Sequence, residues 1–169
     1  MGGDIKNIHI LLLVSLSFGL LSAQDFQPQS KTELQNAISL WISDNATALA
    51  DHGHISTWDV SLMTDMTQLF SGKTTFNDDI GDWDVSSVTK MNQMFFAADS
   101  FNQDISNWDV SSVTTLDYMF YHVENFNQDL TNWNTSNVTQ LEHMFREAPS
   151  FNGDLSNWDV SNVIYMHLM

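Results

Sequence analysis

The chain of 169 residues is long enough for one domain with a sizeable core, and its hydrophobic content of 43% argues against a disordered chain. Its 21 acidic residues outnumber the 5 Lys and Arg residues, which gives a formal net charge of −16. Because nucleic acids and anionic membranes would repel such a chain, no nucleic-acid partner is expected, and cations or basic partners are favoured. The sequence contains no cysteine, which excludes disulfides, thiol chemistry and a lipid-modified cysteine.

Residues 1–23 have the layout of a cleavable signal peptide. An apolar run from Ile8 to Leu21 is shorter than the roughly 20 residues that a membrane span needs. The small residues Ser22 and Ala23 follow it, and we expect cleavage after Ala23. This predicts a secreted or cell-surface protein with no membrane insertion after signal cleavage. An uncleaved N-terminal anchor is the alternative.

Residues 24–54 are predicted to form an N-terminal capping helix segment. Ser30 and Glu33 have the spacing of a helix capping box. Apolar residues then recur on one helical face, namely Leu34, Ala37, Ile38, Trp41 and Ile42. An isolated helix of about three turns is marginally stable in water, so we expect its apolar face to pack against the repeats that follow.

Residues 55–169 form a tandem array of one 25-residue unit, with four full copies and one partial copy. The period is marked by Trp58, Trp83, Trp108, Trp133 and Trp158. Phe, Asn and Asp also recur at fixed distances from each tryptophan. A period of this length is typical of stacked repeats, in which each unit completes its core against its neighbours.

Each unit is predicted to contain one short strand and one short helix. Trp83 alternates with Val85 as in a strand, and the spacing from Ile80 to Val88 matches that of leucine-rich repeats. Val88, Met91, Met94 and Ala98 then follow helical spacing. The predicted fold class is therefore an α/β solenoid: a leucine-rich-repeat-like, right-handed stack of short parallel strands and short helices, with an N-terminal capping helix.

The repeated Trp, Phe and Met residues are predicted to fill the core, because they share the inward phase of the pattern. A repeated asparagine occurs at Asn77, Asn102, Asn127 and Asn152. We expect the side-chain amides of this row to bond the backbone of the adjacent turn, which would satisfy polar groups in the loops. Ligand contact is the alternative for this row.

A repeated aspartate occurs at Asp79, Asp104, Asp129 and Asp154. Stacked carboxylates about 5 Å apart repel one another by roughly 1 kcal/mol in water, so some group must offset the repulsion. Hydrogen bonds to nearby backbone amides are the preferred explanation. Ca²⁺ bound by these four residues is the alternative, although no known calcium-loop motif is present. No cofactor is therefore expected apart from this alternative.

Residues on either side of each inward Trp and Val are predicted to point outward and to form a polar, acidic face. This candidate binding face contains Asp59, Asp82, Asp84, Ser86, Asn107, Asp109, Ser111, Asn132, Asn134, Ser136, Asn157 and Asp159. Such a face could bind a protein or a host or cell-surface ligand. A solvated face with no ligand is the alternative.

The sequence shows no catalytic constellation. The histidines do not recur with the period, and no Ser-His-Asp arrangement or Gly-rich phosphate loop is present. Since a catalytic site needs a preorganised group of reactive side chains, we do not expect an enzyme.

The phrase F-N-x-D-[IL]-x-x-W-[DN]-x-S-x-V-T-x-[ML]-x-x-M-F resembles the BspA-like leucine-rich-repeat surface proteins, a bacterial family with repeats of this length. The resemblance covers residues 76–169 fully and residues 55–75 more loosely. It implies a secreted or surface-displayed adhesion or interaction module, and no catalytic residue carries over. The expected function is binding through the acidic face. A Ca²⁺-stabilised spacer within a larger surface protein is the alternative.

Overall fold

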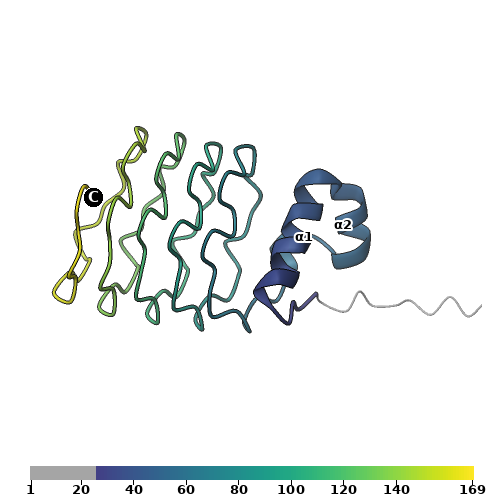
Figure 1. Cartoon of the computed structure of the whole chain (residues 1–169), viewed down its shortest axis with the longest axis horizontal. Coiled ribbons are helices and arrows are strands. Elements are labelled where there is room, and N and C mark those ends of the chain that lie inside the picture. The colour runs from purple at the N-terminus through teal and green to yellow at the C-terminus, as the bar shows by residue number, and fades with distance from the viewer. Residues whose placement is uncertain (1–25) are drawn as a thin grey trace, which may run out of the picture.

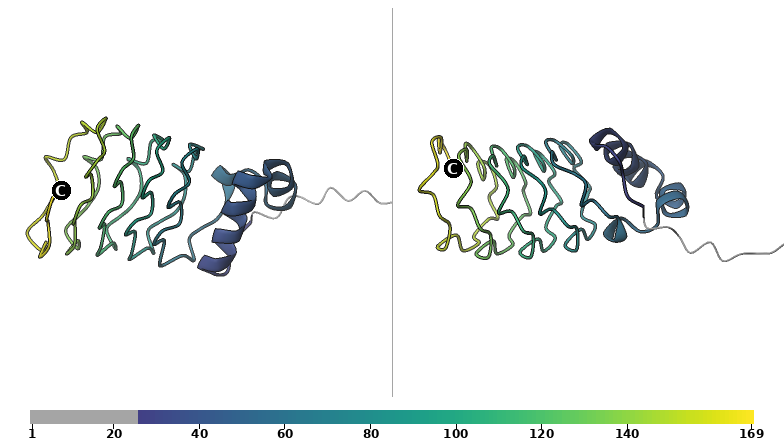
Figure 2. Two further views of the ribbon diagram at one scale, coloured as in Figure 1. Left: turned by 45° about the horizontal axis from the view of Figure 1, so that its top comes forward. Right: turned by 90° about the horizontal axis from the view of Figure 1, so that it is seen from below.

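The computed structural model describes residues 26–169, and the predicted signal peptide of residues 1–23 lies outside them. Two helices, α1 (Lys31–Ser43) and α2 (Asn45–His52), are followed by the 3-10 helix η1 (Ile55–Thr57) and then by a stack of coils (Figure 1). The helices lie at one end of the stack and the C-terminus lies in the last coil at the other end (Figure 2). Within the described residues, no helix is both long and apolar enough to cross a membrane.

The stack contains five coils, which we number by the tryptophan that begins each one. Coils 1 to 5 begin at Trp58, Trp83, Trp108, Trp133 and Trp158. Isolated parallel bridges join successive coils in one row through Asp65, Lys90, Thr115, Gln140 and Tyr165. Because the bridged residues are one period apart, each repeat of the sequence forms one coil of the stack.

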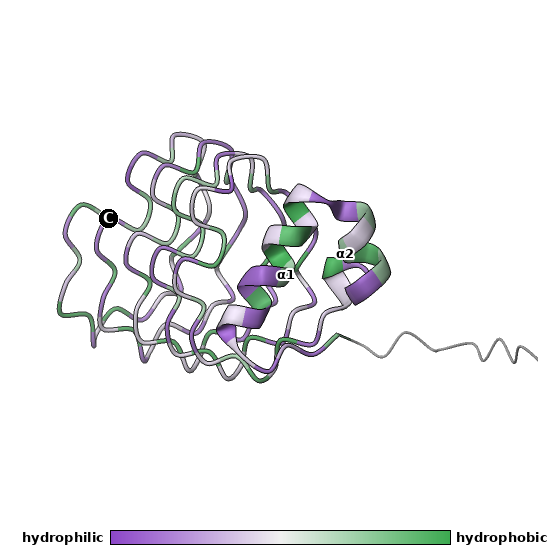
Figure 3. Cartoon of the chain, turned by 45° about the vertical axis from the view of Figure 1, so that its right-hand side comes forward, coloured by the Kyte–Doolittle hydropathy of each residue, from purple (hydrophilic) through white to green (hydrophobic). Residues whose placement is uncertain are grey.

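Helix α1 begins where the sequence predicts. The Ser30 side chain accepts a hydrogen bond from the backbone N–H of Glu33, 3.2 Å away, which satisfies one free donor of the first turn. The predicted apolar face is buried at Leu34, Ala37, Ile38 and Trp41, whereas Ile42 is exposed. Hydrophobic and hydrophilic residues are both visible along the helix, which lies beside the coils (Figure 3). The prediction of an amphipathic helix in residues 24–54 is confirmed.

Helix α2 was not predicted. Asp44 ends α1, because its backbone N–H bonds the carbonyl oxygen of Leu40 at 2.7 Å. Its side chain then accepts a hydrogen bond from the N–H of Thr47 at 3.2 Å and so begins α2. The sequence from 43 to 45 therefore both stops one helix and starts the next.

The predicted α/β solenoid, a leucine-rich-repeat-like stack of short parallel strands and short helices, is wrong. Residues 26–169 contain no β-strand, and every helix among them lies before Trp58. The coils consist of turns and irregular backbone joined by single bridges. Neither of the two elements expected in each unit forms, for two separate physical reasons.

The expected helix is replaced by a ladder between coils. In coil 2 the N–H groups of Gln93, Phe95 and Ala97 donate to carbonyl oxygens of coil 3, at 2.8, 3.0 and 2.9 Å, instead of to their own turn. Between these inter-coil bonds, the chain is bent by hydrogen bonds from an N–H to the carbonyl oxygen three residues earlier. One example runs from the N–H of Met94 to the carbonyl oxygen of Met91, at 3.1 Å. Successive turns of this kind give apolar spacings of three and four, which resemble those of a helix.

The expected strand is cut short by a turn. The side chain of Asp84 accepts a hydrogen bond from the N–H of Ser86 at 3.0 Å, and the N–H of Val88 donates to the carbonyl of Val85 at 2.9 Å. Both bonds bend the chain directly after the Trp83–Val85 pair. The extended segment is therefore too short to pair as a strand with the neighbouring coil.

Side chains of all the coils stack into one core. Trp83 is buried, and Phe95 and Met91 have no exposed surface. Phe95 stacks on Phe120 of the next coil, with ring centroids 5.6 Å apart, and on Phe101 of its own coil, at 3.9 Å. The prediction that the repeated Trp, Phe and Met residues form the core is confirmed.

The repeated asparagines tie the coils together along one edge. The side-chain oxygen of Asn77 accepts a hydrogen bond from the backbone N–H of Asn102 at 2.8 Å. The side-chain oxygen of Asn102 accepts the equivalent hydrogen bond from the N–H of Asn127 at 2.9 Å, and that of Asn127 accepts one from the N–H of Asn152 at 2.8 Å. The predicted bonding of these amides to the adjacent turn is confirmed.

Candidate interaction surface

The residues predicted to form the acidic face all lie at the surface of the stack. Eight are exposed, namely Asp82, Asp84, Asn107, Asp109, Asn132, Asn134, Asn157 and Asp159. The other four are partly exposed, namely Asp59, Ser86, Ser111 and Ser136. Their outward placement agrees with the prediction even though no strand carries them. We keep the name acidic face for these twelve residues.

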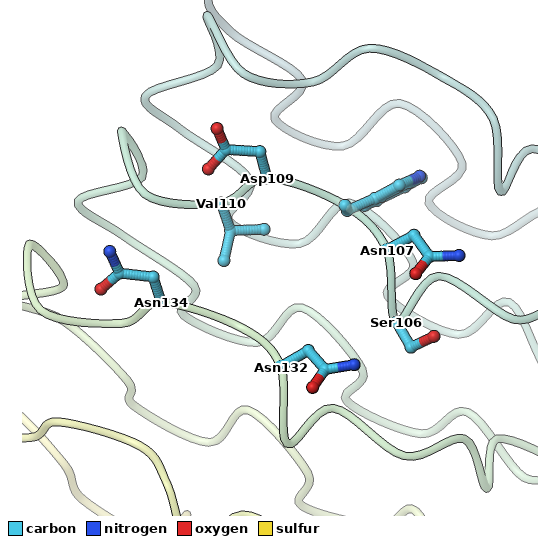
Figure 4. Close-up of a pocket in the computed structure, with 7 residues that line it drawn as sticks. Ser106, Asn107, Asp109, Val110, Asn132 and Asn134 are labelled. Carbon is cyan, nitrogen blue, oxygen red and sulfur yellow. The ribbon is translucent and has the colours of Figure 1, made fainter.

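A shallow hollow of about 410 Å³ lies within the acidic face, between coils 3 and 4. Asn107, Asp109, Asn132 and Asn134 stand around it, and their carboxylate and amide groups can be followed in Figure 4. The lining also includes Ser106 and the buried residues Trp108 and Val110. The hollow therefore has a polar rim and an apolar floor, as protein-binding surfaces commonly have.

The aspartates that follow each tryptophan also shape the turns. Oδ1 of Asp109 accepts a hydrogen bond from the backbone N–H of Ser111, two residues later, at 3.0 Å. Asp59 and Asp159 accept the equivalent hydrogen bond from the serine two residues after each of them. The serine hydroxyl and then the serine N–H lower the pKa of all three carboxyl groups. These side chains are therefore ionised at neutral pH and held in one orientation by the turn.

The second aspartate row has the same local role. Oδ1 of Asp79, Asp104, Asp129 and Asp154 accepts the backbone N–H two residues later, over distances between 2.8 and 2.9 Å. Hydrogen bonds to the hydroxyl and N–H of Ser106 lower the pKa of Asp104. The predicted bonding to backbone amides is confirmed. Within residues 26–169, no three His, Asp or Glu side chains lie close enough together to hold a metal ion.

A second group of side chains at the surface, most of them partly exposed, lies on coils 2 to 4 and was not identified from the sequence. We call it the aromatic patch and define it as Phe96, Tyr118, Tyr121, His143 and Arg146. None of the five is fully buried, and all belong to the ladder segment that had been expected to form helices. The available signal was that these positions differ from copy to copy, whereas the core positions repeat.

No curated protein and no solved structure is similar to the chain. A family model does match it, over residues 39–135 and 104–169, and is described as "Mycoplasma protein of unknown function, DUF285". The two matched segments overlap within the coils and together extend from the second half of α1 to the last residue. Since the match covers well over half of the sequence, the chain belongs to the DUF285 family.

Proposed function

We propose that this protein is a secreted or cell-surface interaction module that binds a protein or a host or cell-surface ligand through its acidic face. The observation that carries the proposal is the hollow between coils 3 and 4, where the ionised carboxylate of Asp109 and three asparagine amides surround an apolar floor. The resemblance to BspA-like surface repeats and the signal-peptide layout of residues 1–23 also support it.

The charge of the face favours a partner with basic groups. Asp109 keeps its negative charge at neutral pH because the turn lowers the pKa of its carboxyl group. The chain as a whole is also strongly acidic, which accelerates the approach of basic partners and repels acidic ones. The turn also fixes the side chain before binding, which lowers the entropy that association would otherwise cost.

We propose a non-catalytic role. The repeated polar side chains engage backbone amides of their own turns, so they are already used in holding the coil. Binding by a repeated surface needs only an ordered display of side chains, which the stack supplies. Catalysis would need a local cluster that departs from the repeat and brings a reactive pair together.

The test uses the mature chain and immobilised fibronectin, laminin and collagen. Replacing Asn107 and Asn132 by Lys changes the charge around the hollow without removing a turn-forming aspartate. Because both side chains line the hollow, we expect the double variant to bind about tenfold more weakly, equivalent to about 1.4 kcal/mol. The matched control carries lysines at Thr75 and Ser150, which are exposed and line no part of the hollow.

The proposal is supported if the control binds like the wild type while the Asn107→Lys/Asn132→Lys variant is weakened. Equal weakening of both variants would show that net charge alone drives binding. Equal binding by the wild type and the Asn107→Lys/Asn132→Lys variant, or retention of the protein in the cytoplasm of its source cells, would also contradict the proposal. Thermal melting with Ca²⁺ and with a chelator tests the spacer alternative, which requires the two midpoints to differ.

A further inference from the structure

The aromatic patch occupies surface positions where the repeat imposes no residue type. The position that Phe96 occupies in coil 2 carries Ser71 in coil 1, Tyr121 in coil 3 and Arg146 in coil 4. The acidic face differs in this respect, because its aspartates recur to form turns. The side chains of the aromatic patch are therefore not explained by the needs of the coil.

The side chains of the patch form two adjoining columns across coils 2 to 4. Phe96 and Tyr121 stack with centroids 4.9 Å apart and planes within 4°, and the guanidinium of Arg146 lies 5.8 Å from the centre of the Tyr121 ring. The ring of Tyr118 packs against the ring of His143, with centroids 4.7 Å apart, and lies beside the ring of Tyr121, with centroids 5.8 Å apart. The result is a continuous surface of partly exposed rings.

The backbone at this surface would suit glycine better than the residues that occupy it. Tyr118 and His143 have φ values of 56° and 54°, in the left-handed region. Coils 1 to 4 each have a second left-handed position, four residues later. In coil 1 this second position is occupied by Gly72, with φ of 71°. A side chain in this conformation costs about 1 kcal/mol relative to glycine. The position of Tyr118 and His143 carries Gln68 and Gln93 in coils 1 and 2, also left-handed, so the coil accepts different side chains here and carries rings only in coils 3 and 4.

One carboxylate contacts the aromatic patch directly. Oε1 of Glu147 accepts a hydrogen bond from the hydroxyl of Tyr121 at 3.2 Å and lies 3.6 Å from Nε of Arg146. Asp117 and Glu142 occupy the residues directly before Tyr118 and His143. Within the ladder segments of coils 2 to 4, acidic residues therefore outnumber Lys and Arg.

The contact of Arg146 with its neighbours shows which ligand chemistry this arrangement accepts. One guanidinium lies over the face of Tyr121 and beside the carboxylate of Glu147. A cation held between a ring face and a carboxylate gains from both interactions, and arginine stacks on aromatic faces better than lysine does. Tyr118 and Phe96 present further ring surface beside this contact.

We propose that the aromatic patch binds an arginine-rich segment of a partner protein, whose guanidinium groups stack on Tyr118 and Phe96 and pair with nearby carboxylates. This site is separate from the acidic face and does not depend on its function. Tyrosine and arginine are enriched at the centres of protein interfaces, which agrees with a protein partner.

The test measures binding of a fluorescein-labelled peptide of alternating arginine and glycine to the full mature chain, by fluorescence anisotropy at 0.15 M salt. The double variant Tyr118→Ala/Tyr121→Ala removes two ring faces without changing the charge. We expect it to bind about tenfold more weakly, since it removes the Tyr118 ring and the Tyr121 ring on which Phe96 stacks, and each cation–ring contact contributes a few-fold at an exposed site. The variant Tyr118→Phe/Tyr121→Phe retains the rings and should bind like the wild type.

Two controls separate this site from other surfaces. Tyr165→Ala removes an exposed ring from coil 5, and Asn107→Lys/Asn132→Lys alters the acidic face. Both should bind the peptide within about threefold of the wild type, because neither variant changes a residue of the aromatic patch. Loss of peptide binding in the acidic-face variant alone would assign the peptide to the acidic face and overturn the proposal.

Two further outcomes would also overturn it. One is equal affinity of the wild type and the Tyr118→Ala/Tyr121→Ala variant. The other is tighter binding of the neutral sugar chitohexaose than of the peptide, since this would assign the rings to carbohydrate. Because the alanine variant could unfold, the ring NMR signals of Tyr118 and Tyr121 in the wild type provide a second measurement. They should shift when the peptide is added, and unchanged signals would contradict the proposal.

Discussion

The indole Nε1 of Trp108 donates a hydrogen bond to the backbone carbonyl oxygen of Ile80, 3.1 Å away in space and 28 residues earlier in the chain. Trp83, Trp133 and Trp158 make the equivalent contact, each with the carbonyl 28 residues earlier. Each of these tryptophans therefore fills the core and also ties its own turn to a backbone carbonyl more than one period earlier in the chain. A phenylalanine at the same position could fill space but could not make this bond.

Replacing Trp108 by Phe should lower the free energy of unfolding by about 1–3 kcal/mol, because a buried hydrogen bond and part of the core packing are lost. Urea denaturation followed by circular dichroism measures the change. Trp41→Phe is the matched control, since Trp41 is also buried but lies in α1 and makes no bond between coils. Equal losses in the two variants would show that the indole bond adds nothing to the stack.

The turn after each tryptophan predicts a difference between two substitutions at Asp109. The natural sequence carries Asn134 at the equivalent place, where its side-chain oxygen accepts the N–H of Ser136 at 3.2 Å. Asp109→Asn should therefore keep the turn and change stability by less than about 0.5 kcal/mol, whereas Asp109→Ala should cost about 1 kcal/mol. Thermal melting compares the two variants. An asparagine variant as unstable as the alanine variant would contradict this account.

Helix α1 is attached to coil 1 by an ion pair that predicts a pH dependence. Nζ of Lys31 lies 2.9 Å from Oδ1 of Asp65. Burial raises the pKa of Asp65, but hydrogen bonds from Lys31 and Thr67 outweigh this effect and lower it to about 2. The resulting stabilisation is complete above the ordinary value of 3.8 and is lost as the pH falls through about 2.

Replacing Lys31 by Gln should therefore lower the thermal midpoint at pH 7, and the difference from the wild type should shrink as the pH falls from 3.8 toward 2. Melting curves recorded across this range measure the effect. Lys73→Gln removes the same charge without an ion pair of this kind and should show no such trend. A difference that stays constant over the whole range would exclude the ion pair as its source.

The left-handed positions predict two opposite effects on stability. Gly72 has φ of 71°, and an added Cβ would meet nothing within 4 Å, so Gly72→Ala should cost about 1 kcal/mol through backbone strain alone. Ala97 occupies the equivalent place in coil 2 with φ of 52°, and Ala97→Gly should stabilise the chain by a similar amount. Chemical denaturation measures both variants. Shifts of the same sign would contradict the backbone conformation described.

The helix and the core could be predicted from the sequence because their signals are local or strictly periodic. Ser30 and Glu33 fix the start of α1, and the recurrence of Trp, Phe and Asn fixes the stacking and the asparagine ladder. The bonding of the Asp79, Asp104, Asp129 and Asp154 row to backbone amides also followed, since Asp side chains commonly bond the N–H two residues later.

The secondary structure of the coil could not be predicted because two different backbones produce the same apolar spacing. Val88, Met91 and Met94 are buried at intervals of three, which fits a helix as well as a series of turns. The two backbones differ only in which carbonyl oxygen accepts the hydrogen bond from each N–H group. In the coils this acceptor lies 24 residues later in the chain, as in the bond from Gln93 to Asp117. The aromatic patch was missed for the same reason, because Tyr118 had been assigned to a helix.

The central claim is that the repeated buried and turn-forming residues build the stack, whereas side chains on its surface bind partners, among them the aromatic patch at positions that do not repeat. The most direct measurement records the melting midpoint and the affinity for the arginine–glycine peptide in two variants. We predict that Tyr118→Ala/Tyr121→Ala loses about tenfold in affinity with little change in midpoint, while Asp109→Ala loses stability with unchanged affinity. The opposite pattern, or a parallel change of both quantities in both variants, would contradict the claim.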